Sequence, residues 1–159
     1  MLQRFDVNQL IDELCERLQD IEFEDYDEES ELLLDVGDVV AEYINTALEE
    51  MAHVWVKGRD KGKSKSVWAF GTDFCPAITV EVREMPTVAI EVKLAKRDGS
   101  LADSVAVAIG QALLYSVQYS YVIVFVLDRT NSDLYKHWLD SEVEARLWDN
   151  HEIRLIVSQ

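Results

Sequence analysis

An acidic and a basic residue stand two positions apart in the stretch Ile90-Glu91-Val92-Lys93. Side chains alternate between the two faces of a β-strand, so Glu91 and Lys93 share the face opposite that of Ile90 and Val92. Burying a charged pair is costly unless the two groups are partnered or serve a function. Because an E-x-K tripeptide is common, the pair by itself is also typical of a solvated edge strand.

Two further polar residues follow on a helix that the pattern predicts over residues 101–118. Gln111 and Tyr115 are four positions apart, so they lie on one side of that helix. Ser100 and Asp103 have the spacing of a capping box, which predicts where the helix begins. The order of an acid, a short hairpin, I-E-V-K and a helix with Q-x-x-x-Y is more specific than any one of these motifs.

The rest of the chain predicts an α/β protein with a mixed sheet and helices on both sides. Apolar residues at helical spacing predict helices over 6–19 and 31–51, the second with Ser30 as its N-cap, and a later helix over 132–148. Alternating or continuous apolar runs predict six strands, at 53–57, 66–70, 76–82, 87–94, 121–128 and 151–158.

The spacing of these elements also predicts how the strands pair. The strands between 66 and 94 are close together in sequence and predict an antiparallel meander. The later strands alternate with helices, which predicts parallel pairing. We expect residues 1–29 to form an acidic N-terminal helix and linker, and residues 30–159 to form one domain.

With the phrases AIEVK and IGQALLY in this order of elements, the chain resembles the PD-(D/E)XK nuclease superfamily over about residues 30–158. The resemblance implies a restriction-endonuclease-like α-β-β-β-α-β core that hydrolyses phosphodiester bonds in DNA with Mg²⁺ or Mn²⁺, as an endonuclease or exonuclease. It makes Glu91 and the backbone carbonyl of Val92 metal ligands, and it assigns Lys93 to the attacking water. Gln111 would orient Lys93 or contact the DNA backbone, and Tyr115 would do the same or pack in the core.

One residue departs from the family pattern. The family has an aspartate after the proline that opens the preceding strand, whereas here Pro76 is followed by Ala77. Asp73 is the alternative acid, 18 residues before Glu91, and Ala77 is 14 residues before it. Register favours position 77, because a side chain there would lie opposite the apolar side chains of its strand, on the face outside the core. Three interpretations stay open: Asp73 is the ligand, the site is naturally degenerate, or this chain carries an inactivating Asp→Ala substitution.

A helix glutamate is an additional ligand that the resemblance implies for some family members. Glu31, at the start of the second predicted helix, is the candidate, and Glu42 is the second choice. The simpler interpretation of either residue is a solvated acid on a helix surface.

The charge of the chain is unevenly placed. Residues 1–50 contain 17 acidic and two basic residues, a net charge of −15, whereas residues 51–159 contain 14 acidic and 13 basic residues, a net charge of −1. Acidic surfaces repel phosphate backbones, so affinity for DNA has to come from the second segment. Five of these 13 basic residues gather in and beside one predicted loop, which either contacts phosphates or is a solvated hairpin tip. They are Lys57, Arg59, Lys61, Lys63 and Lys65.

Expectations about partners and location follow from the same features. The acidic N-terminus is a solubilising surface, a DNA mimic or a binding surface for a basic protein, and small nucleases of this fold often act as homodimers. The alternative function is a catalytically inactive nuclease-fold protein that binds nucleic acid or protein. No apolar run approaches the roughly 20 residues of a membrane span and no signal peptide is visible, so we expect a cytoplasmic protein without a membrane partner. The tryptophans are expected to pack in the core: Trp55, Trp68, Trp138 and Trp148.

Overall fold

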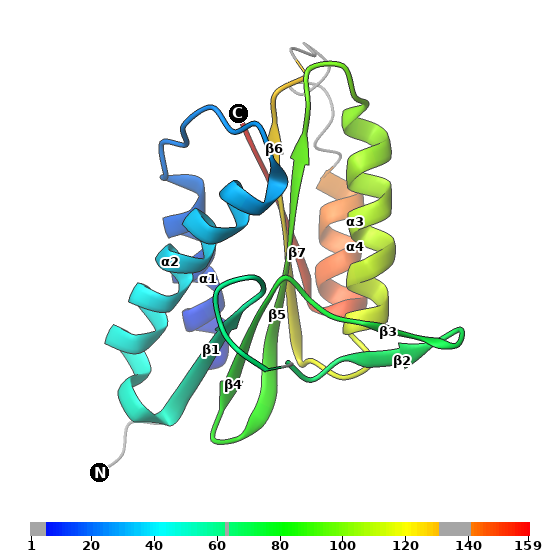
Figure 1. Ribbon diagram of the computed structural model, residues 1–159. Helices are drawn as coiled ribbons and strands as arrows, with labels where there is room; N and C mark the ends of the chain where they lie inside the picture. The colour runs from blue at the N-terminus through cyan, green and yellow to red at the C-terminus, as the bar shows by residue number, and fades with distance from the viewer. Residues whose placement is uncertain (1–5, 63, 131–140) are drawn as a thin grey trace.

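A mixed sheet lies between two layers of helices in the computed structural model, which describes residues 6–62, 64–130 and 141–159 (Figure 1). Its strand order is β1–β4–β5–β6–β7. The antiparallel part consists of β1 (Ala52–Val56), β4 (Ile78–Val82) and β5 (Met85–Ala95). The parallel part adds β6 (Tyr121–Asp128) and β7 (Ile153–Ser158), as the alternation of helices and strands predicted.

Helices α1 (Val7–Gln19) and α2 (Glu29–Leu48) cover one face of the sheet. The buried side chains of α1 pack in the same apolar cluster as those of α2 and the strands. The prediction that Ser30 is the N-cap of α2 is wrong. The N-cap is Glu28 and the helix begins at Glu29, so Ser30 lies inside its first turn. A short 3₁₀ turn, η1 (Glu49–Met51), leads from α2 into β1.

Helices α3 (Leu101–Tyr115) and α4 (Ser141–His151) cover the other face. The predicted cap of α3 is confirmed, since the Ser100 hydroxyl accepts a hydrogen bond from the amide of Asp103 at 3.2 Å. The predicted helix over 132–148 falls partly outside the described residues, and only its end coincides with α4. No helix in the described parts of the chain is both long and apolar enough to cross a bilayer.

The two faces of β5 pack in different apolar clusters. Ile90 and Val92 belong to the cluster under α1 and α2, whereas Ala89 and Ala95 belong to the cluster under α3. This confirms the alternation that the sequence predicted for the strand. Since helices cover both faces, Glu91 on the α3 side is almost fully buried, with 5% of its surface exposed.

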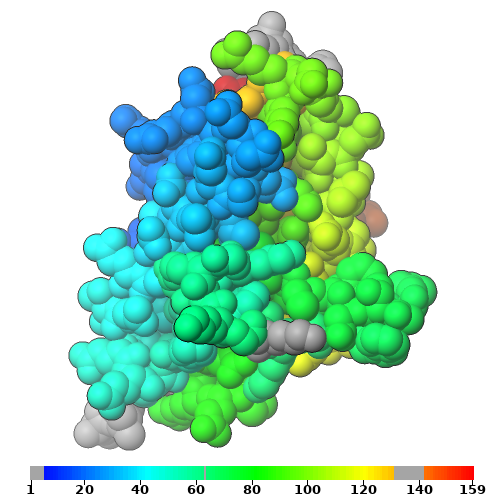
Figure 2. Space-filling model, viewed as in Figure 1, coloured from blue at the N-terminus to red at the C-terminus, as the bar shows by residue number. Residues whose placement is uncertain are grey.

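A small hairpin stands apart from the main sheet. Strands β2 (Val67–Ala69) and β3 (Thr72–Phe74) pair only with each other, and the hairpin projects as a separate lobe (Figures 1 and 2). The predicted antiparallel meander is therefore wrong for this segment, because β1 pairs with β4 and leaves β2 outside the sheet. The prediction that Trp68 packs in the core is also wrong, since it lies on the outer side of this hairpin with 69% of its surface exposed.

The other tryptophans differ from Trp68. Trp55 and Trp148 are partly buried, and Trp148 stacks on Tyr121 and lies under the guanidinium of Arg154. Trp138 lies outside the described residues.

Candidate functional site

The candidate site lies where β5 extends beyond its neighbour β4. The pairing of these strands ends at Ile78 and Ile90, so the later residues of β5 have no strand on that side. Backbone groups of alternate residues point to the same side of a strand. The amide of Leu94 points to this open side and donates to Oε2 of Glu29 at 3.0 Å. By the same alternation, the carbonyl of Val92 faces the open edge, as its predicted role as a ligand requires.

Two carboxylates flank one ammonium at this edge. Lys93 Nζ lies 3.3 Å from Oε1 of Glu91 and 3.7 Å from Oε1 of Glu29. Glu91 and Lys93 come from the same face of β5, whereas Glu29 is the first residue of α2, a helix on the other face of the sheet. The two layers meet here because β4, which would otherwise separate them, has not yet begun.

Glu91 is the most buried of these three groups. Its side chain is 7% exposed, compared with 20% for Lys93 and 43% for Glu29. Burial raises the pKa of the Glu91 carboxyl, and the attraction of Lys93 and hydrogen bonds from Lys93 and Tyr115 partly offset this rise. The carboxyl therefore gives up its proton less readily than an exposed glutamate, and Lys93 favours its ionised form.

Of the two residues predicted on α3, Tyr115 reaches this region. Tyr115 is 1% exposed, and burial together with the nearby Glu91 carboxylate raises the pKa of its phenol. Its hydroxyl is within hydrogen-bonding reach of Glu91 and of the Cys75 carbonyl, the latter at 3.2 Å, and its single hydrogen serves one of them at a time. One turn earlier, Oε1 of Gln111 is buried without a hydrogen-bond partner. A free acceptor of this kind is costly, and costly groups of this kind are typical of functional sites.

Position 77 adjoins the site but carries no acid. Extended by one residue, the pairing of Ile78 with Ile90 places Ala77 opposite Glu91. Ala77 is 7% exposed and belongs to the apolar cluster under α1 and α2, and its carbonyl accepts from the amide of Lys57 at 2.9 Å. The prediction that this residue faces away from the core is wrong, because helices cover both faces of the sheet.

The other predicted acids lie elsewhere. Asp73 is exposed on β3, where its carboxylate accepts from the Ser66 hydroxyl at 3.1 Å. The Glu31 carboxylate accepts from the amide of Asp27 at 3.3 Å, before the start of α2. The glutamate that reaches β5 is Glu29, two positions earlier. The sequence pointed to this turn of the helix, but an N-cap placed at Ser30 left Glu29 outside the predicted helix.

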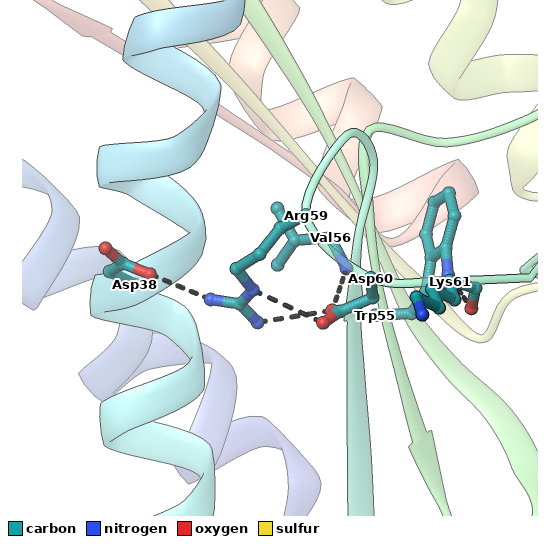
Figure 3. A network of polar contacts seen from close by, with 6 residues as sticks. All are labelled: Asp38, Trp55, Val56, Arg59, Asp60 and Lys61. Atoms are coloured by element: carbon teal, nitrogen blue, oxygen red, sulfur yellow. Dashed lines mark hydrogen bonds and ion pairs between the residues drawn. The ribbon is translucent and has the colours of Figure 1, made fainter.

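Two basic residues of the predicted loop form ion pairs with acids of the same chain. Arg59 forms ion pairs with Asp38 of α2 at 2.8 Å and with Asp60 at 3.3 Å (Figure 3). Lys65 forms an ion pair with Glu81 at 3.7 Å. These contacts hold the loop against the protein, and Lys57 and Lys61 are the exposed basic side chains that remain among its described residues. Lys63 lies outside the described residues.

A magnesium ion would find a small set of donors here. Among residues 6–62, 64–130 and 141–159, no group of three His, Cys, Asp or Glu side chains is arranged to hold a metal. Mg²⁺ is commonly held by one or two carboxylates together with water and substrate phosphates. Glu91, Glu29 and the Val92 carbonyl form such a set of oxygen donors. They fit an ion that is shared with a bound phosphate, not an ion that the protein holds alone.

Comparison with known proteins adds no family to this geometry. No protein-family model, no curated protein and no solved structure matches the chain. Statements about activity therefore rest on the residues and their arrangement.

Proposed function

We propose that this chain is a metal-dependent nuclease of the PD-(D/E)XK type that acts on DNA at the open edge of β5. The observation that carries the proposal is the convergence of Glu91, Glu29 and Lys93 on this edge, with ammonium-to-carboxylate distances of 3.3 and 3.7 Å. The order of α2, three antiparallel strands, α3 and the parallel strand β6 agrees with the core that the sequence resemblance implies.

The residues of the chain have separate parts in this proposal. Glu91, Glu29 and the Val92 carbonyl would hold Mg²⁺, which, when bound, acidifies water and offsets the charge of a phosphate. Lys93 presents a positive charge to the scissile phosphate, where it stabilises the charge that develops during hydrolysis. Tyr115 would donate to the Glu91 carboxylate when its hydrogen is turned away from the Cys75 carbonyl, and the free acceptor of Gln111, one turn earlier on α3, would bind an ammonium or a water.

Glu29 takes the place of the missing strand acid in this arrangement. A family member with aspartate at position 77 would supply its second carboxylate from β4, whereas here Ala77 supplies none. Glu29 enters the same gap from α2, because β4 begins only at Ile78. The site therefore has two carboxylates in spite of the alanine.

A catalytically inactive nuclease-fold protein that binds nucleic acid or protein is the second candidate. Ala77 favours it, because the alanine removes the acid that the family pattern places beside Glu91. In this case the charged groups at the edge of β5 would bind a phosphate backbone without cleaving it.

Cleavage assays separate these candidates. We expect the wild-type chain to cut supercoiled plasmid or single-stranded DNA with Mg²⁺ or Mn²⁺. Glu91→Gln should lower the rate by about 100-fold or more, because glutamine has nearly the shape of glutamate but lacks the charge that binds the metal. Thermal unfolding with and without DNA and metal checks that the variant is folded and that its response to metal is reduced. If the wild-type chain binds these DNAs and cuts none of them with either metal, the inactive candidate replaces the nuclease.

A further inference from the structure

Two aromatic side chains of the β2–β3 hairpin are exposed to solvent, Trp68 on the outer side of β2 and Phe70 in the turn between the strands. Trp68 is 69% exposed and Phe70 is 90% exposed. On the inner face, Val67 and Phe74 form a cross-strand pair and pack against the apolar cluster under α3. The hairpin thus buries one apolar face. On its outer face Trp68 lies across from the exposed Asp73, and a large exposed ring is unusual on a solvated strand face, which is ordinarily polar.

Large exposed rings are a cost that a protein usually avoids. Burying an aromatic side chain removes roughly 150–250 Å² of accessible surface from water, so leaving these two exposed means that the fold lacks the hydrophobic stabilisation their burial would give. Among the large apolar side chains of the described residues that are mostly exposed, Trp68 and Phe70 are the aromatic ones. Contiguous exposed apolar surface is typical of binding sites, so two large rings two residues apart make this hairpin a candidate for one.

The hairpin is held firmly at both ends. The Tyr119 hydroxyl donates to the carbonyl of Lys65 at 2.6 Å, before β2 begins. The Tyr115 hydroxyl reaches the carbonyl of Cys75 at 3.2 Å, after β3 ends. Both tyrosines come from the end of α3 and the turn that follows it. Binding to a platform that is already ordered costs little conformational entropy.

The charge of this segment differs from that of the whole chain. Residues 57–74 contain five basic and two acidic residues, a net charge of +3, within a chain of net charge −16. Arg59 and Lys65 form ion pairs with Asp38 and Glu81 outside this segment. The exposed Lys57 and Lys61, in the loop before the hairpin, therefore supply the positive charge that remains among its described residues. Figure 2 shows this loop and the hairpin on the same face of the molecule. A local excess of positive charge beside exposed aromatic rings favours a phosphate-bearing ligand with flat apolar groups.

We propose that the β2–β3 hairpin is a stacking platform for the unpaired bases of single-stranded nucleic acid. Trp68 and Phe70 stack on bases, and Lys57 and Lys61 contact the backbone. The base of the hairpin leads through Cys75 and Pro76 to Ala77, which lies opposite Glu91, so a strand bound along the hairpin toward its base approaches the site of Glu91 and Lys93. The inference rests on the proposed function in that it names the substrate of that site. Bases in a duplex are stacked on each other, so the platform selects single strands, overhangs or frayed ends.

Anisotropy of dye-labelled oligonucleotides tests the platform. The full chain is titrated with a single-stranded 20-mer and with the blunt duplex of the same sequence, in EDTA so that no cleavage occurs. Stacking on one aromatic side chain is worth about tenfold in affinity or more. We expect Trp68→Ala with Phe70→Ala to weaken single-strand binding by about tenfold to a hundredfold. Duplex binding changes less than about twofold, and Trp68→Phe with Phe70→Tyr restores single-strand binding.

Val107→Ala is the matched control, because Val107 is an exposed apolar residue of α3 with 56% of its surface accessible. It leaves both affinities unchanged. Equal loss of single-strand and duplex binding, no loss in the double alanine variant, or no binding by the wild-type chain would overturn the platform. Hairpin-dependent sedimentation with vesicles of phosphatidylcholine and phosphatidylserine, without an effect on oligonucleotide binding, would overturn it in favour of a membrane surface.

The two proposals fail in different experiments. If the hairpin binds single strands but the chain never cleaves DNA, hydrolysis is wrong and the platform stands. If Glu91→Gln abolishes cleavage while the double alanine variant binds single strands normally, the platform is wrong and hydrolysis stands.

Discussion

The two sides of the candidate site differ in how they are built. On the side of β5 and α3, Glu91 and Lys93 come from one strand face and Tyr115 lies one helical turn from Gln111. On the side of α2 and β4, the strand position next to Glu91 is an alanine, and the acid comes from the first residue of a helix. The first side has the residues expected from the resemblance in sequence to the nuclease superfamily, and the second departs from that expectation.

This difference teaches that a strand edge can accept an acid from either neighbouring element. The open edge of β5 needs a partner for the amide of Leu94, because an unpaired buried amide costs free energy. Glu29 satisfies that amide and brings its second oxygen toward Lys93. The open edge that leaves room for a ligand thus also exposes an amide that a carboxylate can satisfy.

On the side of α2 and β4, the largest effect is expected from Glu29→Gln. The glutamine side chain keeps an oxygen that accepts from the Leu94 amide, but the substitution removes one of the two negative charges of the site. We therefore expect the cleavage rate to fall about 100-fold, which corresponds to near 3 kcal/mol of transition-state stabilisation. The variant should also need more Mg²⁺ to reach half of its own maximal rate. Glu31→Gln, two positions along α2, is the matched control and changes the rate less than about twofold. Similar rates for the two variants would show that Glu29 only caps the edge of β5.

Ala77→Asp restores the family pattern on the side of β4. A carboxylate opposite Glu91 adds an oxygen donor, so we expect cleavage to rise about tenfold, equal to about 1.4 kcal/mol. Without metal, the new charge in an apolar cluster lowers the free energy of unfolding by about 1–3 kcal/mol, measured by urea denaturation. Mg²⁺ should recover part of that loss. Ala77→Asn is similar in size to Ala77→Asp but uncharged, so it should lose less stability and should not raise the cleavage rate. A faster rate with asparagine as well would contradict the role of the charge.

Gln111→Met tests the other side of the site. The substitution removes a buried acceptor that has no partner, so the free energy of unfolding should rise by about 1 kcal/mol while cleavage falls. Gln118→Met, at an exposed position after α3, changes stability by less than about 0.5 kcal/mol. Denaturation curves for both variants give the comparison. A less stable Gln111→Met protein would mean that the amide is satisfied and structural.

A smaller effect concerns pH. The native state raises the pKa of Glu91 above its ordinary value of 4.5, so it binds this proton more tightly than the unfolded chain does. The stability that this contributes is present below pH 4.5 and is lost as the pH rises through the native pKa. Relative to the wild type, Glu91→Gln should therefore gain stability as the pH is raised from acidic to neutral.

Glu13 is the control, because the native state lowers its pKa whereas it raises that of Glu91. Hydrogen bonds from Tyr43 and Gln9 lower the pKa of Glu13, so its contribution is present above the unfolded pKa and is lost at acidic pH. Glu13→Gln should therefore lose stability relative to the wild type as the pH rises. Urea denaturation across this range measures both differences, and slopes of the same sign would contradict the assignment for Glu91.

Much of the fold follows from local patterns in the sequence. The periodic apolar residues of α1 and α3, and the continuous apolar run of β6, identify elements whose residues pack as their spacing predicts. The β2–β3 hairpin could not be predicted in this way. Its residues have strand character, but tertiary competition decides the pairing, and β4 takes the place beside β1.

The site divides in the same manner. Strand alternation is sufficient to place Glu91 and Lys93 together, and helical spacing adds Tyr115. Glu29 could not be assigned, because its role depends on where α2 begins and where β4 begins, and a shift of two residues moves the expected ligand to Glu31. Boundaries of elements are set by caps and packing more than by local preference.

The open edge of β5 also bears on self-association. An uncovered strand edge is a template for pairing with another chain, and natural proteins protect such edges with charges or by covering them. Here a helix terminus supplies a carboxylate to the edge amide, and a lysine stands beside it. The groups assigned to hydrolysis thus also guard against aggregation, so selection for solubility alone would preserve them after activity had been lost.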